Sequence, residues 1–330
     1  MKIATIILNW NGRKMLEQFL PSVVQHTLGE VIIADNGSTD DSLAFLQEHY
    51  PTLRTIALDK NYGFAEGYNR AIAQVEADYY ILLNDDVEVT PHWVEPVIAQ
   101  MEASDTIAIA QPKLLMHTQR DTFEYAGGAG GFIDKHGYPF CRGRIFTTLE
   151  QDHGQYDDAC EIFWASGAAM FVKASVWKAL GGLDGQFFAH MEEIDFCWRA
   201  KNQGYQVVYC PQSVVYHLGG GTLPKSNPRK TYLNFRNNCA LLYKNLPQER
   251  LAPVMRLRWL LDLVAALKFL LQGHTKECSA VFQAHRDFRS WKPALRAQRQ
   301  ALQPHEVSCI YPKNILLSYY LKGKKTYSQL

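Results

Sequence analysis

The chain has 330 residues, which is enough to bury a hydrophobic core without disulfides or a structural metal. Its 34 Lys and Arg residues nearly balance its 33 Asp and Glu residues, so no overall charge favours nucleic acid, and we expect no nucleic-acid partner. The seven cysteines are scattered and include no Cys-x-x-Cys pair. This pattern excludes the common zinc and redox motifs and predicts a reducing, cytoplasmic setting.

The N-terminal segment MKIATIILNWNG predicts a first β-strand. Its apolar run is short and is broken by asparagine and glycine, and no cleavage site of small residues follows, so it does not read as a signal peptide. A membrane-spanning helix needs about 18 uncharged apolar residues in succession. The best candidate, residues 255–273, contains two arginines, an aspartate and a lysine, so we expect no membrane span.

The first hundred residues alternate strand-type and helix-type segments. Strand-type runs cover residues 2–8, 30–37, 53–59 and 78–87, and helices are expected around residues 19–24, after residue 41 and over residues 65–75. This alternation predicts βαβ units and an α/β fold with a mostly parallel, Rossmann-like sheet that carries helices on both faces. Ligands of such sheets bind at the carboxyl ends of the strands.

Polar clusters follow each of these strands, at residues 9–12, 35–40, 60–63 and 84–86. A single cluster is more often a turn or a helix cap, but four clusters at one sheet edge predict a ligand site. Residues 111–159 are rich in glycine and aromatics, which predicts an irregular hairpin insertion. After about residue 232 the chain becomes helical and more basic. We therefore expect a catalytic domain over residues 1–240 and a helical region over residues 241–330.

Three of the polar segments contain residues suited to catalysis or metal binding. Asp35, at a strand tip, is expected to contact a ligand, whereas the Ser and Thr that follow it are expected to cap a helix. The segment LLNDDV places two carboxylates directly after a buried strand, where they favour a divalent cation such as Mg²⁺ or Mn²⁺ shared with a diphosphate. His217 follows an apolar run and precedes glycines, so it is either structural or a metal ligand.

Three acids open a helix that begins near residue 192. Asp195 lies four residues before Arg199, and this spacing predicts a structural ion pair on one helix face. The adjacent Glu192 and Glu193 point about 100° apart on a helix, so only one of them readily faces a given ligand.

Eight motifs together resemble glycosyltransferase family 2, and within it the bacterial rhamnosyltransferase-like enzymes. In chain order they are TIILNWNG, ADNGSTDDS, KNYGFAEGYNRAI, LLNDDV, WASGAAMFVK, EEIDFCWRA, VVYHLGGGT and RKTYLNFRNN, and the resemblance extends from Ile3 to about Asn245. It implies a GT-A fold and an inverting transfer from a dTDP- or UDP-sugar donor. The acceptor it implies is a glycan or a polyprenyl-diphosphate-linked glycan, in cell-surface polysaccharide synthesis.

The same resemblance assigns roles residue by residue. Asp86 and His217 correspond to the ligands of the metal, and Glu193 to the catalytic base; many relatives have Asp at that position, which leaves Glu192 as the alternative. Asn84 stands where a strict Asp-x-Asp motif has its first Asp. The positions that the resemblance places around the nucleotide sugar are Trp10, Asn11, Asp35, Lys60, Asn61, Gly63, Asn84, Asp85 and Trp164. Trp164 is equally a candidate for the core.

The segment after His217 is expected to close over the donor diphosphate. Gly219 to Thr222 would supply the mobility, and Arg229, Lys230 and Arg236 the positive charge. A solvated basic connector is the alternative for the first two of these cations.

Residues 255–274 are apolar around most of the predicted helix and carry arginines at its start. Such a segment either packs on the catalytic domain or lies on a membrane. The enzymes that this chain resembles often act on polyprenyl-diphosphate-linked glycans, and this resemblance implies peripheral contact with the cytoplasmic membrane face. A sugar nucleotidyltransferase is disfavoured because the loop NWNGRK holds one glycine. An inactive nucleotide-sugar-binding scaffold is the remaining alternative.

Overall fold

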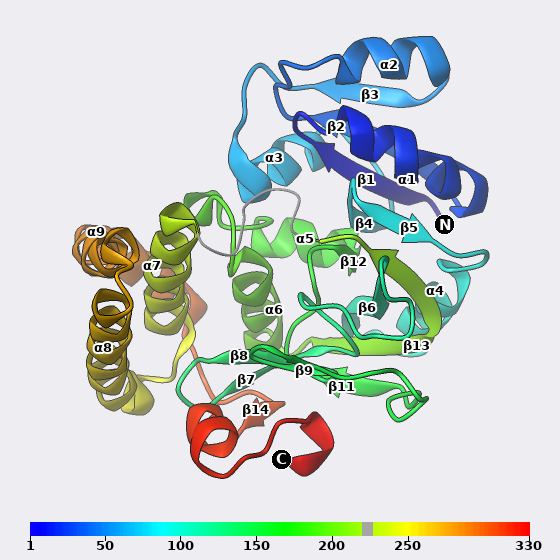
Figure 1. Ribbon diagram of the computed structural model, residues 1–330. Helices are drawn as coiled ribbons and strands as arrows, with labels where there is room; N and C mark the ends of the chain where they lie inside the picture. The colour runs from blue at the N-terminus through cyan, green and yellow to red at the C-terminus, as the bar shows by residue number, and fades with distance from the viewer. Residues whose placement is uncertain (220–226) are drawn as a thin grey trace.

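The computed structural model describes residues 1–219 and 227–330. Figure 1 shows a large sheet with its helices, a smaller sheet beside it, and a layer of helices from the C-terminal third. The prediction that Gly220 to Thr222 belong to a closing loop concerns residues outside the described ranges.

The N-terminal part is the expected alternation of strands and helices. Its strands are β1 (Ile3–Asn9), β2 (Glu30–Asp35), β3 (Arg54–Ala57) and β4 (Tyr79–Asn84), and its helices are α1 (Arg13–His26), α2 (Ser42–His49) and α3 (Gly63–Ile72). The four strands pair in parallel in the order β4-β1-β2-β3. Alternate residues of β1 face two cores, one with α3 and the other with α1 and α2. Both faces of the sheet are therefore covered, as predicted.

The same sheet continues beyond β4 with mixed strand directions. The further strands are β5 (Val87–Val89), β6 (Ile107–Met116), β11 (Cys160–Ile162), β12 (Ala169–Lys173) and β13 (Gln206–His217). The order is β11-β13-β6-β12-β4-β1-β2-β3, with β5 paired to β13. The helices of this part are α4 (Glu95–Glu102), α5 (Ala174–Leu180) and α6 (Glu192–Asn202). Antiparallel β12 lies between β4 and β6 and brings the second half of the chain beside the first.

The expected insertion begins later than the sequence predicts. Residues 111–116 belong to β6, because this segment is almost entirely buried and pairs with β13. The insertion itself forms the smaller sheet, whose antiparallel strands are β7 (Gly131–Asp134), β8 (Pro139–Cys141), β9 (Arg144–Ile145) and β10 (Thr148–Leu149). At the β8–β9 turn Gly143 has φ +95°, and a Cβ there would lie 2.4 Å from the Phe123 ring. Glycine is required at that position.

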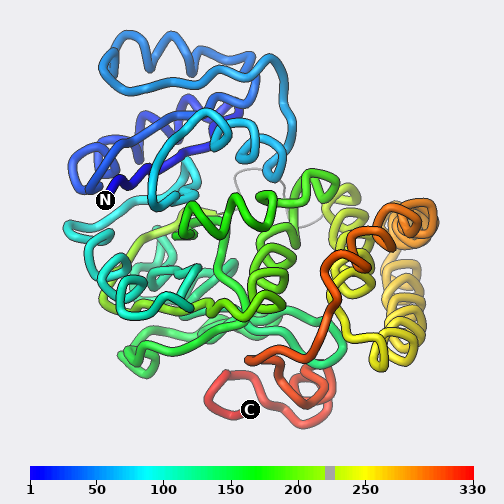
Figure 2. Tube along the Cα trace, turned by 180° about the vertical axis from the view of Figure 1, so that it is seen from behind, coloured from blue at the N-terminus to red at the C-terminus, as the bar shows by residue number. Residues whose placement is uncertain are grey.

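The C-terminal third forms three packed helices, α7 (Pro228–Asn245), α8 (Gln248–Leu271) and α9 (Thr275–Leu302). The proposed boundary at residue 240 falls inside α7. Figure 2 shows the segment after α9 running back to the smaller sheet, where β14 (Ile310–Tyr311) pairs in parallel with β7. Short helical turns cover Gly185–Phe187, Leu317–Leu321 and Tyr327–Gln329. Among the helices of the described ranges, none combines the length and apolar character that crossing a bilayer requires.

Candidate active site

The polar ends of β1, β2 and β4 meet at one edge of the large sheet. The register pairs Asn9 with Asp35 and Leu8 with Asn84, so these strands end side by side. Asn9 Nδ2 donates to Asp35 Oδ2 at 2.9 Å and to Ser38 Oγ at 3.1 Å. The clusters that the sequence analysis singled out are therefore neighbours in space.

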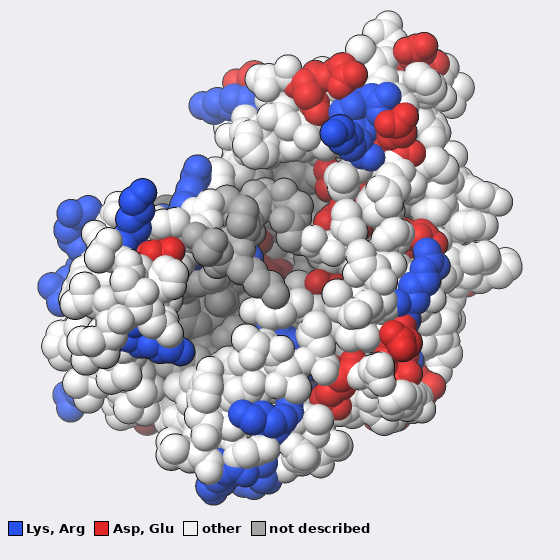
Figure 3. All heavy atoms as spheres, in the orientation of Figure 1, with Lys and Arg blue, Asp and Glu red and all other residues white. Residues whose placement is uncertain are grey.

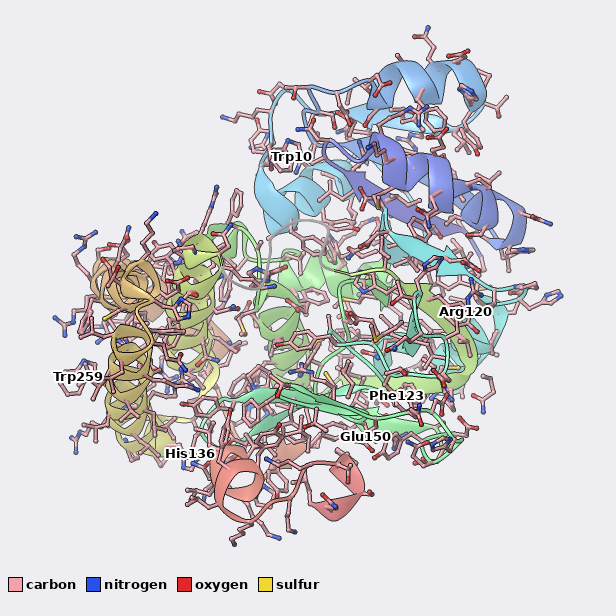
Figure 4. All side chains as sticks on the ribbon, viewed as in Figure 1. Trp10, Arg120, Phe123, His136, Glu150 and Trp259 are labelled. Atoms are coloured by element: carbon pink, nitrogen blue, oxygen red, sulfur yellow. The ribbon has the colours of Figure 1, made fainter. Side chains whose placement is uncertain are left out.

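Asn11 and Asp35 organise the loop between β2 and α2. Asn11 has φ 52°, and its Oδ1 accepts a hydrogen bond from the backbone N–H of Thr39 at 2.7 Å. The buried Asp35 carboxylate accepts from Asn9 and from the N–H of Ser38 at 2.9 Å. Trp10 lies between these two fixed asparagines, and 45% of its side chain is exposed. Figure 4 shows it at the end of β1, close to α3.

Residues 60–63 are held against the same loop by Asn36. Its Nδ2 donates to Gly63 O at 3.0 Å, and its Oδ1 accepts from Tyr62 N at 3.0 Å. Asn61 Oδ1 in turn accepts from Gly63 N at 2.7 Å. Lys60 is exposed, and its ammonium group lies 5.1 Å from the centre of the Tyr62 ring. A cation and an exposed indole thus border the strand ends.

Asp86 and His217 form a buried pair where β4 and β13 end. His217 Nε2 lies 3.0 Å from Asp86 Oδ1, and Gly219 N donates to Asp86 Oδ2 at 3.1 Å. Asn84 Nδ2 lies 3.3 Å from the same imidazole nitrogen. On the other side of the ring, Nδ1 lies 3.4 Å from Oε1 of Glu124, which is also buried. Residues distant in sequence thereby share one polar site.

Charge around this pair shifts the pKa values of its members. Burial raises the pKa of Asp85 to about 7, and the neighbouring Asp86 acts in the same direction. Burial also disfavours the ionised form of Asp86, but the His217 imidazole outweighs it and lowers the pKa of Asp86. For His217 burial works downwards, while Glu124 and Asp86 prevail and hold its pKa well above the ordinary value. The site concentrates negative charge around one imidazole.

The donor set fits a divalent cation. Two ligand atoms on adjacent vertices of an octahedron lie about 3.0 Å apart when each is about 2.1 Å from the ion. The Asp86–His217 separation of 3.0 Å has this value. Carboxylate oxygens with one imidazole suit Mn²⁺ and, through the carboxylates, Mg²⁺. The residues present are thus compatible with the expected metal.

The acid pair Glu192 and Glu193 begins α6 after an unusual turn. Phe188, His190 and Met191 have φ values of 66°, 71° and 74°. The buried Asn237 of α7 holds this turn, because its Nδ2 donates to the carbonyls of Phe187, Ala189 and His190 at 2.8–3.0 Å. The turn also contacts the first turn of α3, since Phe64 N donates to Phe188 O at 2.7 Å.

The two glutamates differ in their access to solvent. Glu192 is buried, with 4% exposed, whereas Glu193 is only half-buried. Burial raises the pKa of both, to about 7 for Glu193, and the charge of Glu193 raises that of Glu192 further. Among the described residues, no donor contacts Oε2 of either side chain. Glu193 is therefore the less buried residue of the pair and has a carboxylate of raised pKa, and Glu192 is its covered neighbour.

Two residues of this region escaped the sequence analysis, Glu124 and Arg144. Arg144 of β9 is buried, its Nη2 lies 3.5 Å from Cys141 Sγ, and its guanidinium carbon lies 4.3 Å from the centre of the Tyr125 ring. Within the described chain its Nε has no acceptor. Burial raises the pKa of Cys141, and Glu124 and Glu193 act in the same direction, so this thiol lies near both acids. The smaller sheet therefore brings a buried cation into the neighbourhood of Glu124 and Glu193.

Comparison with known proteins identifies the family to which the part of the chain containing these strand ends belongs. Residues 5–160 match the family model described as glycosyl transferase family 2. This part of the chain is a glycosyl transferase family 2 domain. The N-acetylglucosaminyl-diphospho-decaprenol L-rhamnosyltransferase of Mycobacterium tuberculosis (strain CDC 1551 / Oshkosh) is 26% identical over 223 residues, which cover 61% of this chain and 71% of that protein. The low-salt glycan biosynthesis hexosyltransferase Agl10 of Haloferax volcanii is 22% identical over 245 residues, covering 71% and 73%. The protein is a glycosyltransferase.

Solved structures of other glycosyltransferases share its fold. S. aureus TarS 1-349 superposes with a TM-score of 0.57 at 15% identity, covering 92% of this chain and 88% of that one. GalNAc-T7, solved with UDP, GalNAc and Mn²⁺, gives a TM-score of 0.60 at 14% identity, but this chain covers only 48% of it. The expected GT-A architecture followed by C-terminal helices is confirmed.

The glycosyltransferase fold places some of the predicted site residues apart from the others. Trp164 has only 3% of its side chain exposed, its Nε1 donates to Phe132 O at 2.9 Å, and its ring packs against Gly131. These contacts correspond to the core alternative for Trp164, because no face of the ring is left for a sugar. Arg229 and Arg236 line a separate pocket with residues of α9. Lys230 instead lies near His190, whose pKa is lowered to about 4, mainly by burial and further by the Lys230 charge.

Proposed function

We propose that this glycosyltransferase inverts the configuration of a sugar that it moves from a UDP- or dTDP-sugar to a glycan or lipid-linked glycan acceptor. One observation carries the proposal. Glu193 is a half-buried residue whose carboxyl pKa is raised to about 7 by burial, and Cys141 of the smaller sheet lies near both it and Glu124, which contacts the Asp86–His217 pair. Figure 3 shows a hollow in the surface of the molecule, with Asp and Glu atoms along its wall.

The chemistry is a single displacement at the anomeric carbon of the donor. The Glu193 carboxylate takes the proton of the acceptor hydroxyl while that oxygen bonds to the anomeric carbon. The bond between the anomeric carbon and the donor phosphate oxygen breaks, and its electron pair leaves with the nucleoside diphosphate. Because attack and departure occur on opposite faces, the configuration is inverted. Glu192 is buried, and burial together with the charge of Glu193 holds its pKa well above the ordinary value, so it is not the proposed base.

Asp86 and His217 are the proposed ligands of a divalent cation, with Asp85 and Asn84 beside them. When bound there, such a cation supplies positive charge that offsets the charge developing on the diphosphate leaving group. The structures of GalNAc-T7 with UDP, GalNAc and Mn²⁺ and of S. aureus TarS with UDP-GlcNAc are in keeping with this proposal.

The nucleotide is proposed to bind along the ends of β1, β2 and β3. Trp10 offers an exposed ring for the base, while Asp35, held by Asn9, offers a carboxylate edge. Asn11 and the segment Lys60 to Gly63 complete this wall. Lys230, which lies near His190, is the cation that we propose for the donor diphosphate.

The helical region 241–330 is proposed to lie against the inner membrane face while residues 1–240 carry catalysis. The outward face of α8 is apolar, with exposed side chains at Trp259, Leu260, Val264, Leu267, Leu270 and Leu271. Figure 4 shows Trp259 pointing away from the body of the protein. Residues 250–300 contain ten Lys and Arg against three Asp and Glu, and the blue atoms of Figure 3 gather over these helices. An anionic bilayer matches both properties.

The first test measures nucleoside diphosphate release and thermal stabilisation across a panel of UDP- and dTDP-sugars, with and without Mn²⁺. We expect one donor to stabilise the protein only with metal and to be turned over slowly by the wild type. The Glu193→Gln variant should bind that donor equally well and turn it over at least a hundredfold more slowly. Absence of metal-dependent binding for every donor would contradict the proposal.

A further inference from the structure

A basic pocket of about 470 Å³ lies between the first turns of α7 and α9. Its polar lining consists of Arg229, Tyr232 and Arg236 from α7 and Lys276, Ser279 and Gln283 from α9. Phe188 of the turn before α6 contributes an apolar wall. The cavity that these residues line is called the basic pocket below.

The basic pocket contains three cations and no carboxylate among its lining residues. In the described ranges, no ion pair involves Arg229, Arg236 or Lys276. Other basic side chains of the same helices do find acids: Arg286 pairs with Asp287, and Lys244 pairs with Asp184. Asp287, at the edge of the basic pocket, accepts from the Tyr232 hydroxyl at 2.9 Å and pairs with Arg286, so it forms no ion pair with the three lining cations, and their charge favours an anionic ligand.

Arg236 is fixed in position for such a ligand. Its Nη2 donates to the carbonyls of Gln186 and Phe187, both at 3.1 Å, and its Nε donates to Asn237 Oδ1 at 2.9 Å. One N–H of Nη1 is left after the 3.4 Å contact with the Tyr232 hydroxyl. A preformed guanidinium with nearby hydroxyl, amide and ammonium donors matches the oxygens of a phosphate group.

The basic pocket adjoins both the active site and the apolar face of α8. Gly63 packs on the Phe188 ring, and Arg229 lies 4.9 Å from the centre of that ring. On the other side, Lys276 follows the end of α8, where Leu270 and Leu271 are exposed. A ligand reaching from the acid pair to the α8 face would cross the basic pocket.

We propose that the basic pocket binds the phosphate groups of the acceptor, which is a glycan joined through a phosphate or diphosphate to an isoprenoid chain. This rests on the proposed function and names the class of acceptor. The reacting hydroxyl lies at Glu193, the phosphates lie against Arg229, Arg236 and Lys276, and the chain continues along α8. The donor diphosphate occupies the separate site near Asp86 and His217.

The test uses the full-length protein with its donor site saturated by UDP and Mn²⁺. Geranyl diphosphate, a short isoprenoid diphosphate, is then titrated calorimetrically. We expect wild type to bind it and Arg229→Gln/Lys276→Gln to bind it about ten to a hundred times more weakly, since two charge-assisted contacts are lost. Arg296→Gln removes an exposed charge from the same helix, about 30 Å further along, and should not change binding. If the double variant fails to fold, Lys276→Gln can be measured alone, because its side chain is exposed and its replacement should leave the fold intact. The single variant should bind geranyl diphosphate about fivefold more weakly.

Four outcomes would overturn the proposal. Equal weakening of UDP binding in the Lys276→Gln variant would assign the basic pocket to the donor. Unchanged geranyl diphosphate binding in the double variant would show that the basic pocket does not bind the diphosphate. Inorganic pyrophosphate binding as tightly as geranyl diphosphate would indicate a site for free phosphates. If the double variant lost binding to phosphatidylglycerol vesicles but kept its binding of geranyl diphosphate, the ligand of the basic pocket would be a lipid headgroup. A wild type that binds neither UDP nor any donor would instead contradict the proposed function.

Discussion

Replacing Glu193 by glutamine removes the proposed base and keeps the size of the side chain. A positioned general base contributes about 10²–10⁴ to the rate, so donor turnover should fall by at least a hundredfold. The donor site at Asp86 and His217 is untouched, and donor binding should stay within about twofold. The substitution should therefore lower kcat and leave the affinity for the nucleotide sugar unchanged.

The raised pKa of Glu193 predicts how the wild type responds to pH. Burial raises this pKa from 4.5 to about 7, and only the carboxylate accepts a proton. Activity should therefore rise with pH through about 7 and level off above it. The free energy of unfolding should fall over the same pH range, because the folded protein favours the neutral Glu193 carboxyl. The stabilisation from the protonated carboxyl is fully present below the unfolded pKa and is lost as pH rises through about 7. At pH 8 Glu193→Gln should be more stable by up to about 3 kcal/mol, since each pKa unit corresponds to about 1.4 kcal/mol.

The assay compares wild type, Glu193→Gln and Glu192→Gln. Nucleoside diphosphate release is followed from pH 5.5 to pH 9, and unfolding temperatures are recorded in the same buffers. For a chain of this length about 3 kcal/mol corresponds to a shift of roughly 4 °C. If Glu192→Gln abolished turnover while Glu193→Gln retained it, the base would be Glu192. If neither variant altered the pH profile, neither glutamate would be the base.

Four further changes test other parts of the structure. Asp86→Asn should abolish the stabilisation that Mn²⁺ with UDP gives in a thermal melt, and it should also lower the unfolding temperature without metal, because it removes the carboxylate that pairs with the buried His217. Asp195→Asn should destabilise the protein by about 3–5 kcal/mol in urea titration, because it leaves the buried Arg199 and Lys244 without their shared carboxylate. Arg144→Gln removes a buried guanidinium whose Nε has no acceptor in the described chain and is free to donate to a substrate oxygen, so the KM of the donor or acceptor should rise at least tenfold while the melting temperature falls by only a few degrees. Leu267→Asp should reduce co-sedimentation with anionic liposomes and leave donor turnover unchanged.

The sequence predicts the N-terminal half of the fold well because its signals are local. Each strand there is a short apolar run followed at once by polar residues, and the register brings those polar ends together. The ion pair between Asp195 and Arg199 is likewise local, being four residues apart on one helix, and the structure gives it a length of 2.8 Å. Periodicity along the chain is sufficient for both inferences.

Glu124 and Arg144 could not be predicted because their roles depend on contacts between distant segments. Glu124 lies in an irregular stretch and meets His217 only after β6 and β13 have paired. Arg144 lies in a two-residue strand, too short to show a period. The late start of the insertion has the same cause, since β6 owes its length to pairing with β12 and β13. A charged residue in a glycine-rich insertion was the one available signal.

The turn before α6 connects the proposed base Glu193 to the basic pocket and to the helical region. Phe188, His190 and Met191 all have positive φ, which costs about 1–3 kcal/mol at each non-glycine residue unless surrounding contacts hold it. Those contacts come from α7, where Asn237 binds three of the turn's carbonyls and Arg236 binds two. The helix that fixes Glu193 is therefore the helix that lines the basic pocket. A ligand that orders α7 against α9 would also stabilise the turn, so acceptor binding and placement of the base are physically coupled.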